Sequence, residues 1–285
     1  MDIGIGLPGH APWTDGRTLV EWARRAENRG FTTISVSDRL LWSTPEPLIT
    51  LAAAAGATTR IGLLTSVLIG PLRKNHALFA KAAATLDQVA GPGRLRLGLA
   101  PGVRDDDFTE SGTDYHTRGK DFDLLLDRLA TTWRGETQAG PPPATAGGPP
   151  LLFGGTSAAT LRRVAAHGTG WIAGDATVED VEGFAPRLRE AWAGAGRDGS
   201  PQVVASVMYA LGPDAHAAVA RAIGSYYAFA GAEYAEYGVA AAYTSAGRIR
   251  DAVPAFAEAG CDELILMGND PDPAQVDLLA DTLGL

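Results

Sequence analysis

The 285-residue sequence has one cysteine, Cys261, so no disulfide can form within the chain, and a reducing compartment suits it. It has no apolar run long enough to span a bilayer. Residues 1–6 (MDIGIG) have neither the basic nor the apolar part of a signal sequence. We therefore expect a cytoplasmic protein, with Cys261 packed beside an apolar strand rather than acting as a nucleophile.

Positive charge is also scarce, since 24 Lys and Arg face 33 Asp and Glu, for a net charge of -9. An acidic surface argues against nucleic acid and anionic membranes as partners. Asp105, Asp106 and Asp107 have no histidine or further acid at metal-ligand spacing, so we expect a solvated loop or a helix cap there and no metal site. No nucleophile-elbow motif is present. Hydrophobic residues nevertheless make up 46%, which permits a sizeable core.

Strand and helix patterns alternate along the whole chain. Short apolar runs predict eight strands, over residues 2–7, 32–37, 60–67, 94–100, 151–153, 171–173, 203–211 and 263–267. Helical patterns between them cover residues 16–29, 46–57, 75–89, 120–133, 158–166 and 178–192, a long region after 211, and 274–283. This order predicts a single α/β domain over residues 1–285, a (β/α)8 TIM barrel. A doubly wound open sheet is the alternative, although no Rossmann fingerprint follows the first strand.

Two segments go beyond a simple barrel. Residues 225–245 hold five of the seven tyrosines, and a helical pattern puts Tyr227, Ala230, Tyr234 and Tyr237 on one face. This face either packs in the core or belongs to a helical insertion near the barrel mouth that lines a substrate pocket. The helix predicted over 47–58 is apolar nearly all round, which suggests a subunit interface and a homodimer.

Active sites of such barrels lie at the C-terminal ends of the strands. Strand one ends near His10, a lone loop histidine that we expect to be solvated. Strand two ends in Asp38 and Arg39, which are either a salt-bridged loop pair or functional groups. Strand five runs into the segment GGTS, residues 154–157, and then a helix.

The glycines of this segment, Gly154 and Gly155, let a ligand approach the backbone closely. Thr156 or Ser157 can cap the next helix, whose first amides carry partial positive charge. The segment is therefore either a phosphate cradle or an ordinary strand-to-helix turn with a good cap.

Several segments together resemble the luciferase-like monooxygenase family, the bacterial luciferase-like flavin- and F420-dependent oxidoreductases. The matching segments, whose order and spacing span almost the whole chain, are GF at 30–31 with SD at 37–38, ATTRIG at 57–62 through TSV at 65–67, AKAAATLD at 80–87, GRLRLG at 93–98, LFGGTS at 152–157, GTGWI at 168–172 and AGCDE at 259–263.

The resemblance implies a cofactor ring at the barrel mouth. It also implies that the cofactor phosphate is bound by Gly154, Gly155, Thr156 and Ser157. It implies a strand-three bulge with a non-proline cis peptide near Ser66-Val67. The cofactor-binding residues expected on this basis also include Thr65, Ser66, Gly98, Ala100 and Trp171.

One departure from the family concerns the end of strand two. Many members have Asp-His there, whereas this chain has Asp38-Arg39. Arginine stays protonated and cannot serve as a general base near neutral pH, but it can hold an anionic substrate or a reduced flavin ring. We take Asp38, Arg39 and His10 as the candidate catalytic residues, with either His10 or Asp38 replacing the missing base.

Two cofactors fit the resemblance, each with a small organic substrate. Coenzyme F420 would support hydride transfer, and reduced FMN, supplied by a separate flavin reductase, would support oxygenation via a flavin peroxide. A basic groove for the anionic F420 tail could be formed by Arg39, Arg73, Lys74, Arg104 and Arg118. Two other functions stay open: a flavin- or ligand-binding barrel with little catalysis, and a phosphosugar enzyme, which the lack of a strand-end lysine disfavours.

Overall fold

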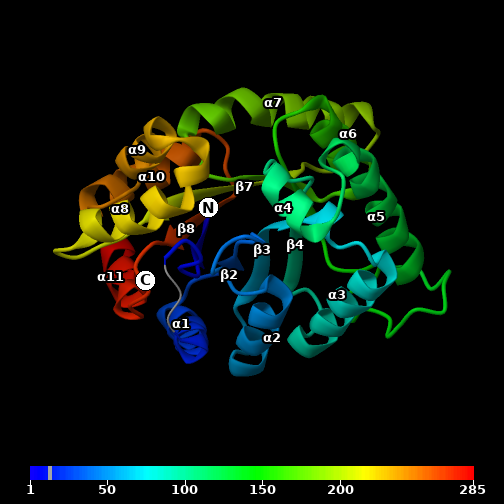
Figure 1. Cartoon of the computed structure of the whole chain (residues 1–285), viewed down its shortest axis with the longest axis horizontal. Helices are drawn as coiled ribbons and strands as arrows, with labels where there is room; N and C mark the ends of the chain where they lie inside the picture. The colour runs from blue at the N-terminus through cyan, green and yellow to red at the C-terminus, as the bar shows by residue number, and fades with distance from the viewer. Residues whose placement is uncertain (12–14) are drawn as a thin grey trace.

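Eight parallel strands close into a barrel in the computed structural model, which describes residues 1–11 and 15–285 (Figure 1). Each strand pairs with its sequence neighbours, and β8 closes the barrel against β1. The predicted TIM barrel is thereby confirmed. The strands are β1 (Asp2–Gly6), β2 (Thr33–Val36), β3 (Gly62–Ile69), β4 (Leu95–Ala100), β5 (Leu151–Gly154), β6 (Gly170–Ala173), β7 (Gln202–Tyr209) and β8 (Glu263–Gly268).

The outer layer of helices surrounds the strands, with neighbours in sequence mostly packed side by side (Figure 1). Apolar residues on the inward stripe of each helix, such as Trp22 and Ala26 of α1, are fully buried. The helices are α1 (Gly16–Arg29), α2 (Pro47–Ala57), α3 (His76–Ala90), α4 (Asp105–Ser111), α5 (Arg118–Trp133), α6 (Ala158–His167), α7 (Val178–Gly194), α8 (Ala215–Tyr226), α9 (Ala232–Ala241), α10 (Ala246–Glu258) and α11 (Ala274–Leu283).

The barrel interior is filled at its N-terminal end. Arg96 of β4 and Glu263 of β8 form an ion pair of 2.7 Å there. Arg96 also donates to Thr33 of β2 and Gln202 of β7, so one guanidinium ties four strands together. Above this polar layer lie apolar side chains such as Leu152. A ligand can therefore enter only at the opposite, C-terminal end.

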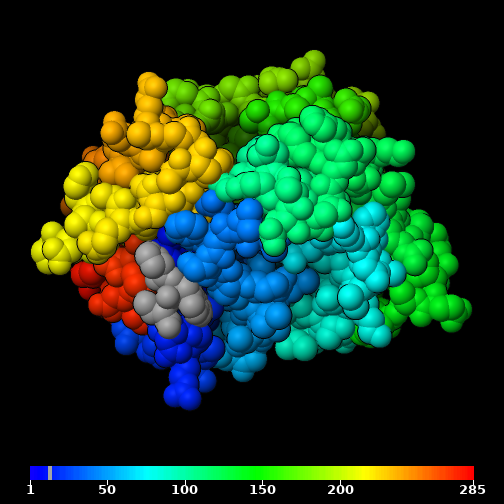
Figure 2. Space-filling view, in the orientation of Figure 1, coloured from blue at the N-terminus to red at the C-terminus, as the bar shows by residue number. Residues whose placement is uncertain are grey.

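Two insertions interrupt the alternation. After β4 the chain forms α4 and the 3-10 turn η2 (Tyr115–Thr117) before α5. After β7 it forms α8, the 3-10 turn η3 (Ala228–Ala230) and α9 before α10, which packs on α7 and α11. Figure 2 shows atoms of this second insertion, in yellow and orange, beside the blue β2–α2 segment and the green α4 segment.

The predicted single tyrosine face in this insertion is wrong. Gly231, at φ +96°, separates α8 and η3 from α9. Tyr227 and Ala230 therefore precede the break, while Tyr234 and Tyr237 lie on α9. A left-handed glycine is inexpensive and ends a helix, which the apolar pattern alone does not reveal.

The other predicted elements agree with the structure to within a few residues. α1 and α11 have the predicted bounds, β3 runs two residues further, and α4 was not predicted. Cys261 is buried, as expected from its place before β8. Within the described ranges, no helix has both the length and the apolar character needed to cross a bilayer.

Candidate active site

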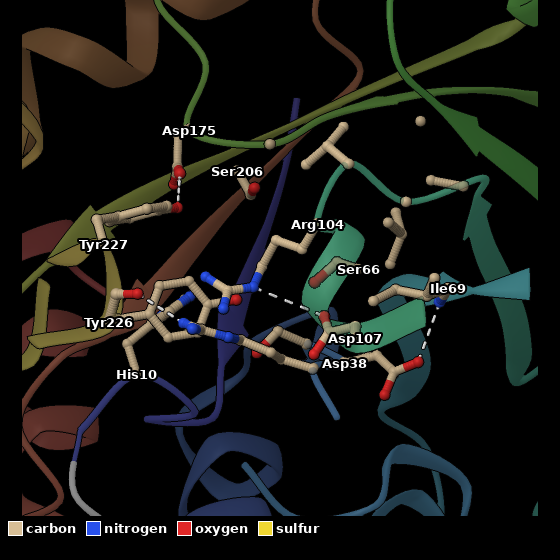
Figure 3. A pocket seen from close by; sticks show the side chains of 18 of the residues that line it. His10, Asp38, Ser66, Ile69, Arg104, Asp107, Asp175, Ser206, Tyr226 and Tyr227 are labelled. Carbon is tan, nitrogen blue, oxygen red and sulfur yellow. Dashed lines mark hydrogen bonds and ion pairs between the residues drawn. The ribbon is translucent and has the colours of Figure 1, made fainter. Parts of the chain in front are cut away.

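A cavity of about 550 Å³ occupies the C-terminal mouth of the barrel. Residues at or just after the ends of all eight strands line it, from His10 after β1 to Met267 of β8. The insertion after β7 adds tyrosines on one side, and Arg104 and Asp107 of the α4 segment project into the same space (Figure 3). The site is therefore where the fold predicts it.

One wall of the cavity consists of small and apolar groups on β3, β4 and β5. Ser66, Val67, Ala100 and Gly154 all line it. The Ser66-Val67 peptide is cis, as predicted, and the β3–β4 register shifts between Thr65 and Leu68. The Ser66 hydroxyl is 2.6 Å from the Ser35 hydroxyl, which donates to it. This wall is a smooth surface suited to the face of a planar ring.

Thr65 and Gly98 lie behind this wall and do not line the cavity. The Thr65 hydroxyl donates to the carbonyl oxygen of Gly98 at 2.9 Å. A Cβ on Gly98 would lie 2.1 Å from the Thr65 carbonyl oxygen, so only glycine permits this close approach of β3 and β4. Both residues position the wall rather than contact a ligand.

The predicted phosphate cradle lies beside this wall. Gly155 has φ +92° and lines the cavity, and Ser157 caps α6 by accepting from the Thr160 amide at 3.3 Å. The amides of Ala158 and Ala159, the first two of α6, have no partner among the described residues and can bind an anion. Thr156 and Ser157 are exposed at the rim. The cradle therefore fits a cofactor phosphate.

Trp171 supports the cradle from behind. Its indole Nε1 donates to the Gly155 carbonyl oxygen at 2.8 Å, and its buried ring packs on Phe184 with centroids 4.4 Å apart. Trp171 does not line the cavity, so it orients the Gly155 backbone instead of binding a ligand itself.

Asp38 is buried and does not pair with Arg39, which excludes the predicted loop pair. Its carboxylate accepts from the Ile69 amide at 3.0 Å and from Arg73 at 2.7 Å, and Arg73 also pairs with Glu46. Burial raises the pKa of Asp38, while Arg73 opposes this rise. The carboxylate is thus committed to holding η1 (Gly70–Leu72) and the β2 end in place.

Arg39 is only 7% exposed and lies among aromatic rings. Its guanidinium carbon is 4.4 Å from the ring centroid of Tyr226, 5.0 Å from that of Phe229 and 5.1 Å from that of Trp42. It donates to the Tyr226 carbonyl oxygen at 2.6 Å. Burial lowers the pKa of Arg39, but a guanidinium remains charged at neutral pH.

His10 is buried, so the expectation of a solvated histidine is wrong. Tyr226, from the insertion, packs edge-on to it at 4.2 Å and covers it, a contact between distant segments that the sequence does not reveal. Burial, followed by the charge of Arg39, lowers the pKa of His10 to about 4. The imidazole is therefore neutral at pH 7, and its Nδ1 has no partner among the described residues.

The α4 segment supplies two cavity residues, Asp107, which sequence reasoning missed, and Arg104, which it considered only for the groove of the F420 tail. Asp107 is fully buried, contrary to the expected solvated loop, and accepts from the Leu41 amide at 2.9 Å. Burial raises the pKa of Asp107. Arg104 pairs with Asp106, and its Nε is 3.8 Å from Asp107. Their position shortly after the end of β4 is the sequence feature that could have identified them as cavity residues.

A second cavity of about 300 Å³ adjoins the first beneath α9. Asp175, Met208, Tyr227 and Tyr234 line both. The Tyr227 hydroxyl donates to the Asp175 carboxylate between the two spaces (Figure 3). The predicted pocket-lining role of the tyrosines is thus confirmed for Tyr227 and Tyr234.

The cationic residues expected to form a groove do not gather in one place. Lys74 donates to the Gly112 carbonyl oxygen at 2.5 Å, and Arg118 to that of Tyr115 at 2.8 Å. Only Arg39 and Arg104 of the five line the main cavity. Across residues 1–11 and 15–285, no three His, Cys, Asp or Glu side chains are placed to hold a metal.

The family model of luciferase-like monooxygenases matches residues 1–276, which is nearly the whole chain. The chain belongs to the luciferase-like monooxygenase family. The cis peptide and the glycine cradle of this member lie at the sites that the resemblance implied. Membership also excludes the alternative of an unrelated phosphosugar barrel that needs no flavin.

Two curated relatives of this luciferase-like chain illustrate the range of similarity. A Mycobacterium tuberculosis protein of uncharacterised function is 28% identical over 225 residues, covering 67% of this chain and 79% of that protein. An F420-dependent glucose-6-phosphate dehydrogenase of Kribbella flavida is 33% identical over 152 residues, covering 50% of this chain and 45% of the dehydrogenase.

Solved structures share the fold along the whole luciferase-like chain. A monooxygenase of Streptomyces bottropensis has a TM-score of 0.83 at 20% identity, covering 99% of this chain and 98% of that one. An F420-dependent secondary alcohol dehydrogenase has a TM-score of 0.79 at 19% identity, again covering 99% of this chain and 98% of that one. The FMN-bound oxygenating constituent of a Pseudomonas putida 3,6-diketocamphane monooxygenase has 0.76 at 16%, covering 98% and 96%.

Proposed function

We propose that this protein is an oxidoreductase that uses coenzyme F420 to exchange a hydride with a small organic substrate. The observation that carries the proposal is the smooth wall of Ser66, Val67, Ala100 and Gly154 directly beside the Gly155 cradle. F420 is preferred over FMN because the Kribbella relative of named activity depends on it. FMN, fed by a separate flavin reductase, is the alternative outcome of the test.

The residues at the barrel mouth have different roles in this proposal. Bound cofactor supplies the hydride chemistry, which no protein side chain can supply. The amides at the start of α6 would hold its phosphate, and Val67 and Ala100 would lie against its ring. Tyr226 and Tyr227 would exclude water on the opposite side, and neutral His10 offers an imidazole nitrogen that can accept a hydrogen bond from a substrate hydroxyl.

Fluorescence titration of the purified protein with F420 and with FMN tests the cofactor. Tight binding of F420 alone supports the proposal, and tight binding of FMN alone makes the protein an FMN enzyme. Binding of neither contradicts both. Reduction of bound F420 by alcohols then separates an enzyme from a binding barrel without catalysis.

The cradle itself is tested with Ser157→Asp. Aspartate caps a helix as well as serine does, so the fold is retained, while the added carboxylate repels a phosphate. We expect at least tenfold weaker binding of FMN or F420 and unchanged binding of riboflavin, which has no phosphate. Ser245→Asp, the same change at the N-cap of α10, is the matched control and should alter neither.

We also propose a homodimer through α2 and α3. Ile49 on α2 is 72% exposed and Leu78 on α3 is 61% exposed, and the two helices pack against each other. Ile49→Glu should convert a dimer to a monomer in size-exclusion chromatography with light scattering. A wild-type protein that elutes as a monomer would contradict this proposal.

A further inference from the structure

Arg39 is a buried cation that has no carboxylate in direct contact among the described residues, although Asp106 and Asp107 act on it from a distance. Within the described ranges it forms no ion pair, and its only hydrogen bond goes to the neutral carbonyl oxygen of Tyr226. Its Nε is buried and has no partner there. Buried charges in proteins are normally paired, because desolvation costs several kcal/mol. The rings of Trp42, Tyr226 and Phe229 stabilise the cation but supply no negative charge.

Arg104, the residue just before α4, lies against the same Phe229 ring as Arg39. Its guanidinium carbon is 3.5 Å from the centroid of the Phe229 ring, which also lies 5.0 Å from that of Arg39. Its side chain is 9% exposed. Although it pairs with Asp106, its Nε and Nη1 are buried without hydrogen bonds in the part of the chain that the structure describes. Two guanidinium groups thus present unused donors to one cavity.

The carboxylates around this cavity are mostly committed elsewhere. Asp38 is bound to Arg73, Asp175 to Tyr227 and Asp107 to the Leu41 amide. Asp106, which is half exposed, pairs with Arg104, and the second carboxylate oxygen of Asp107 lies 3.8 Å from the Arg104 Nε. The unused donors of Arg39 and Arg104 therefore match an anion that arrives with a ligand.

We propose that Arg39 and Arg104 bind an oxyanion, a carboxylate or a phosphoryl group, carried by the substrate. The cradle after β5 already provides amides for one phosphate, whereas Arg39 follows β2, on another part of the barrel mouth. Two separate anion sites indicate two anionic groups. Assigning the second group to the substrate rests on the proposed function, in which the cofactor occupies the cradle.

Benzoate and its neutral isostere benzamide probe this pair. Isothermal titration at constant ionic strength should show benzoate binding at least tenfold more tightly than benzamide, both to the free protein and to the protein loaded with F420 or FMN. Phenyl phosphate in the same titration distinguishes a phosphoryl preference from a carboxylate preference. Equal affinity for benzoate and benzamide, or no binding of any anionic probe, overturns the proposal.

Variants assign the binding to the two arginines. Arg39→Met and Arg104→Met should each weaken binding of the preferred anionic probe at least tenfold. Both should change cofactor affinity less than threefold. Arg39→Lys keeps the charge without the planar fork and should fall between wild type and Arg39→Met. Arg24→Met, at an exposed arginine of α1, controls for net charge and should leave anion binding unchanged. Circular dichroism verifies that each variant is folded.

Two further outcomes separate this inference from the proposed function. If the anionic probe displaces the cofactor and both Met variants lose cofactor binding, the arginines serve the cofactor and the inference is wrong. If neither cofactor binds the wild type while the probe binds in an arginine-dependent way, the proposed function fails and the oxyanion site stands.

Discussion

The two halves of the barrel mouth are built in different ways. The half formed by β3 to β6 consists of backbone and small residues: Ser66, Val67, Ala100, Gly154 and Gly155. The half formed by the β1 and β2 ends and the two insertions consists of large side chains, among them His10, Arg39, Arg104 and Tyr226. A backbone surface keeps its shape whatever side chains surround it, whereas a side-chain surface can be changed one residue at a time.

The difference has an electrostatic counterpart. The cradle presents amides at a helix start, whose partial charges are fixed by the fold. The opposite half presents ionisable side chains whose burial changes their pKa values, as for His10 and Asp107. Substitutions in the first half should therefore act on folding and cofactor binding, and those in the second on pH dependence and substrate choice.

The largest effect is expected behind the backbone-built half. Gly98→Ala places a Cβ 2.1 Å from the Thr65 carbonyl oxygen, so β3 and β4 must separate. We expect a loss of about 3 kcal/mol in the free energy of unfolding, measured by urea denaturation.

Gly183→Ala on α7, where a Cβ meets no atom within 4 Å, is the control and should stabilise the protein by up to about 1 kcal/mol. Equal effects of the two substitutions would mean that the close approach at Gly98 is not required.

An effect of similar size is expected at His10 in the side-chain-built half. The unfolded imidazole binds a proton below about pH 6.5, whereas the folded one does so only near pH 4. Stability should therefore fall as the pH drops from 6.5 to 4, and this histidine contributes about 3 kcal/mol to the fall.

His10→Gln removes this contribution. We expect the free energy of unfolding, measured by urea denaturation, to fall less between pH 7.5 and pH 4 for the variant than for the wild type. An equal loss of stability in the two proteins between these pH values would show that His10 is not buried as a neutral ring.

The smallest effect is expected at the support of the cradle. Trp171→Phe retains the packing on Phe184 but removes the hydrogen bond to the Gly155 carbonyl oxygen. We expect a loss of about 1 kcal/mol in stability. Cofactor binding should weaken several-fold in fluorescence titration, while binding of benzoate stays unchanged because it uses the other half. A variant that loses both ligands equally would remove the distinction between the halves.

Within the backbone-built half, the cradle could be predicted from local patterns because its residues are contiguous in the sequence. Gly154, Gly155 and Ser157 stand together between a strand and a helix, so local rules suffice to identify the cradle. The same holds for the barrel itself, since its eight strands and most of its helices show their own apolar period, and their predicted bounds differ from the observed ones by only a few residues.

The side-chain-built half could not be predicted in this way. Arg39 bonds to a carbonyl oxygen 187 positions away, and His10 is buried by the same distant tyrosine. Asp107 looked like a solvated acid because nothing near it in sequence shows that α4 turns it inward to the Leu41 amide. Such contacts depend on the path of the insertions, which single-residue patterns do not encode.

The contact between Tyr227 and Asp175 separates cavities of about 550 and 300 Å³. Rotation of one phenol side chain away from that carboxylate would join them into a single chamber. Tyr227 is then one of the side chains that set how far a ligand could extend from the barrel mouth, together with Met208 and Tyr234, which also line both cavities.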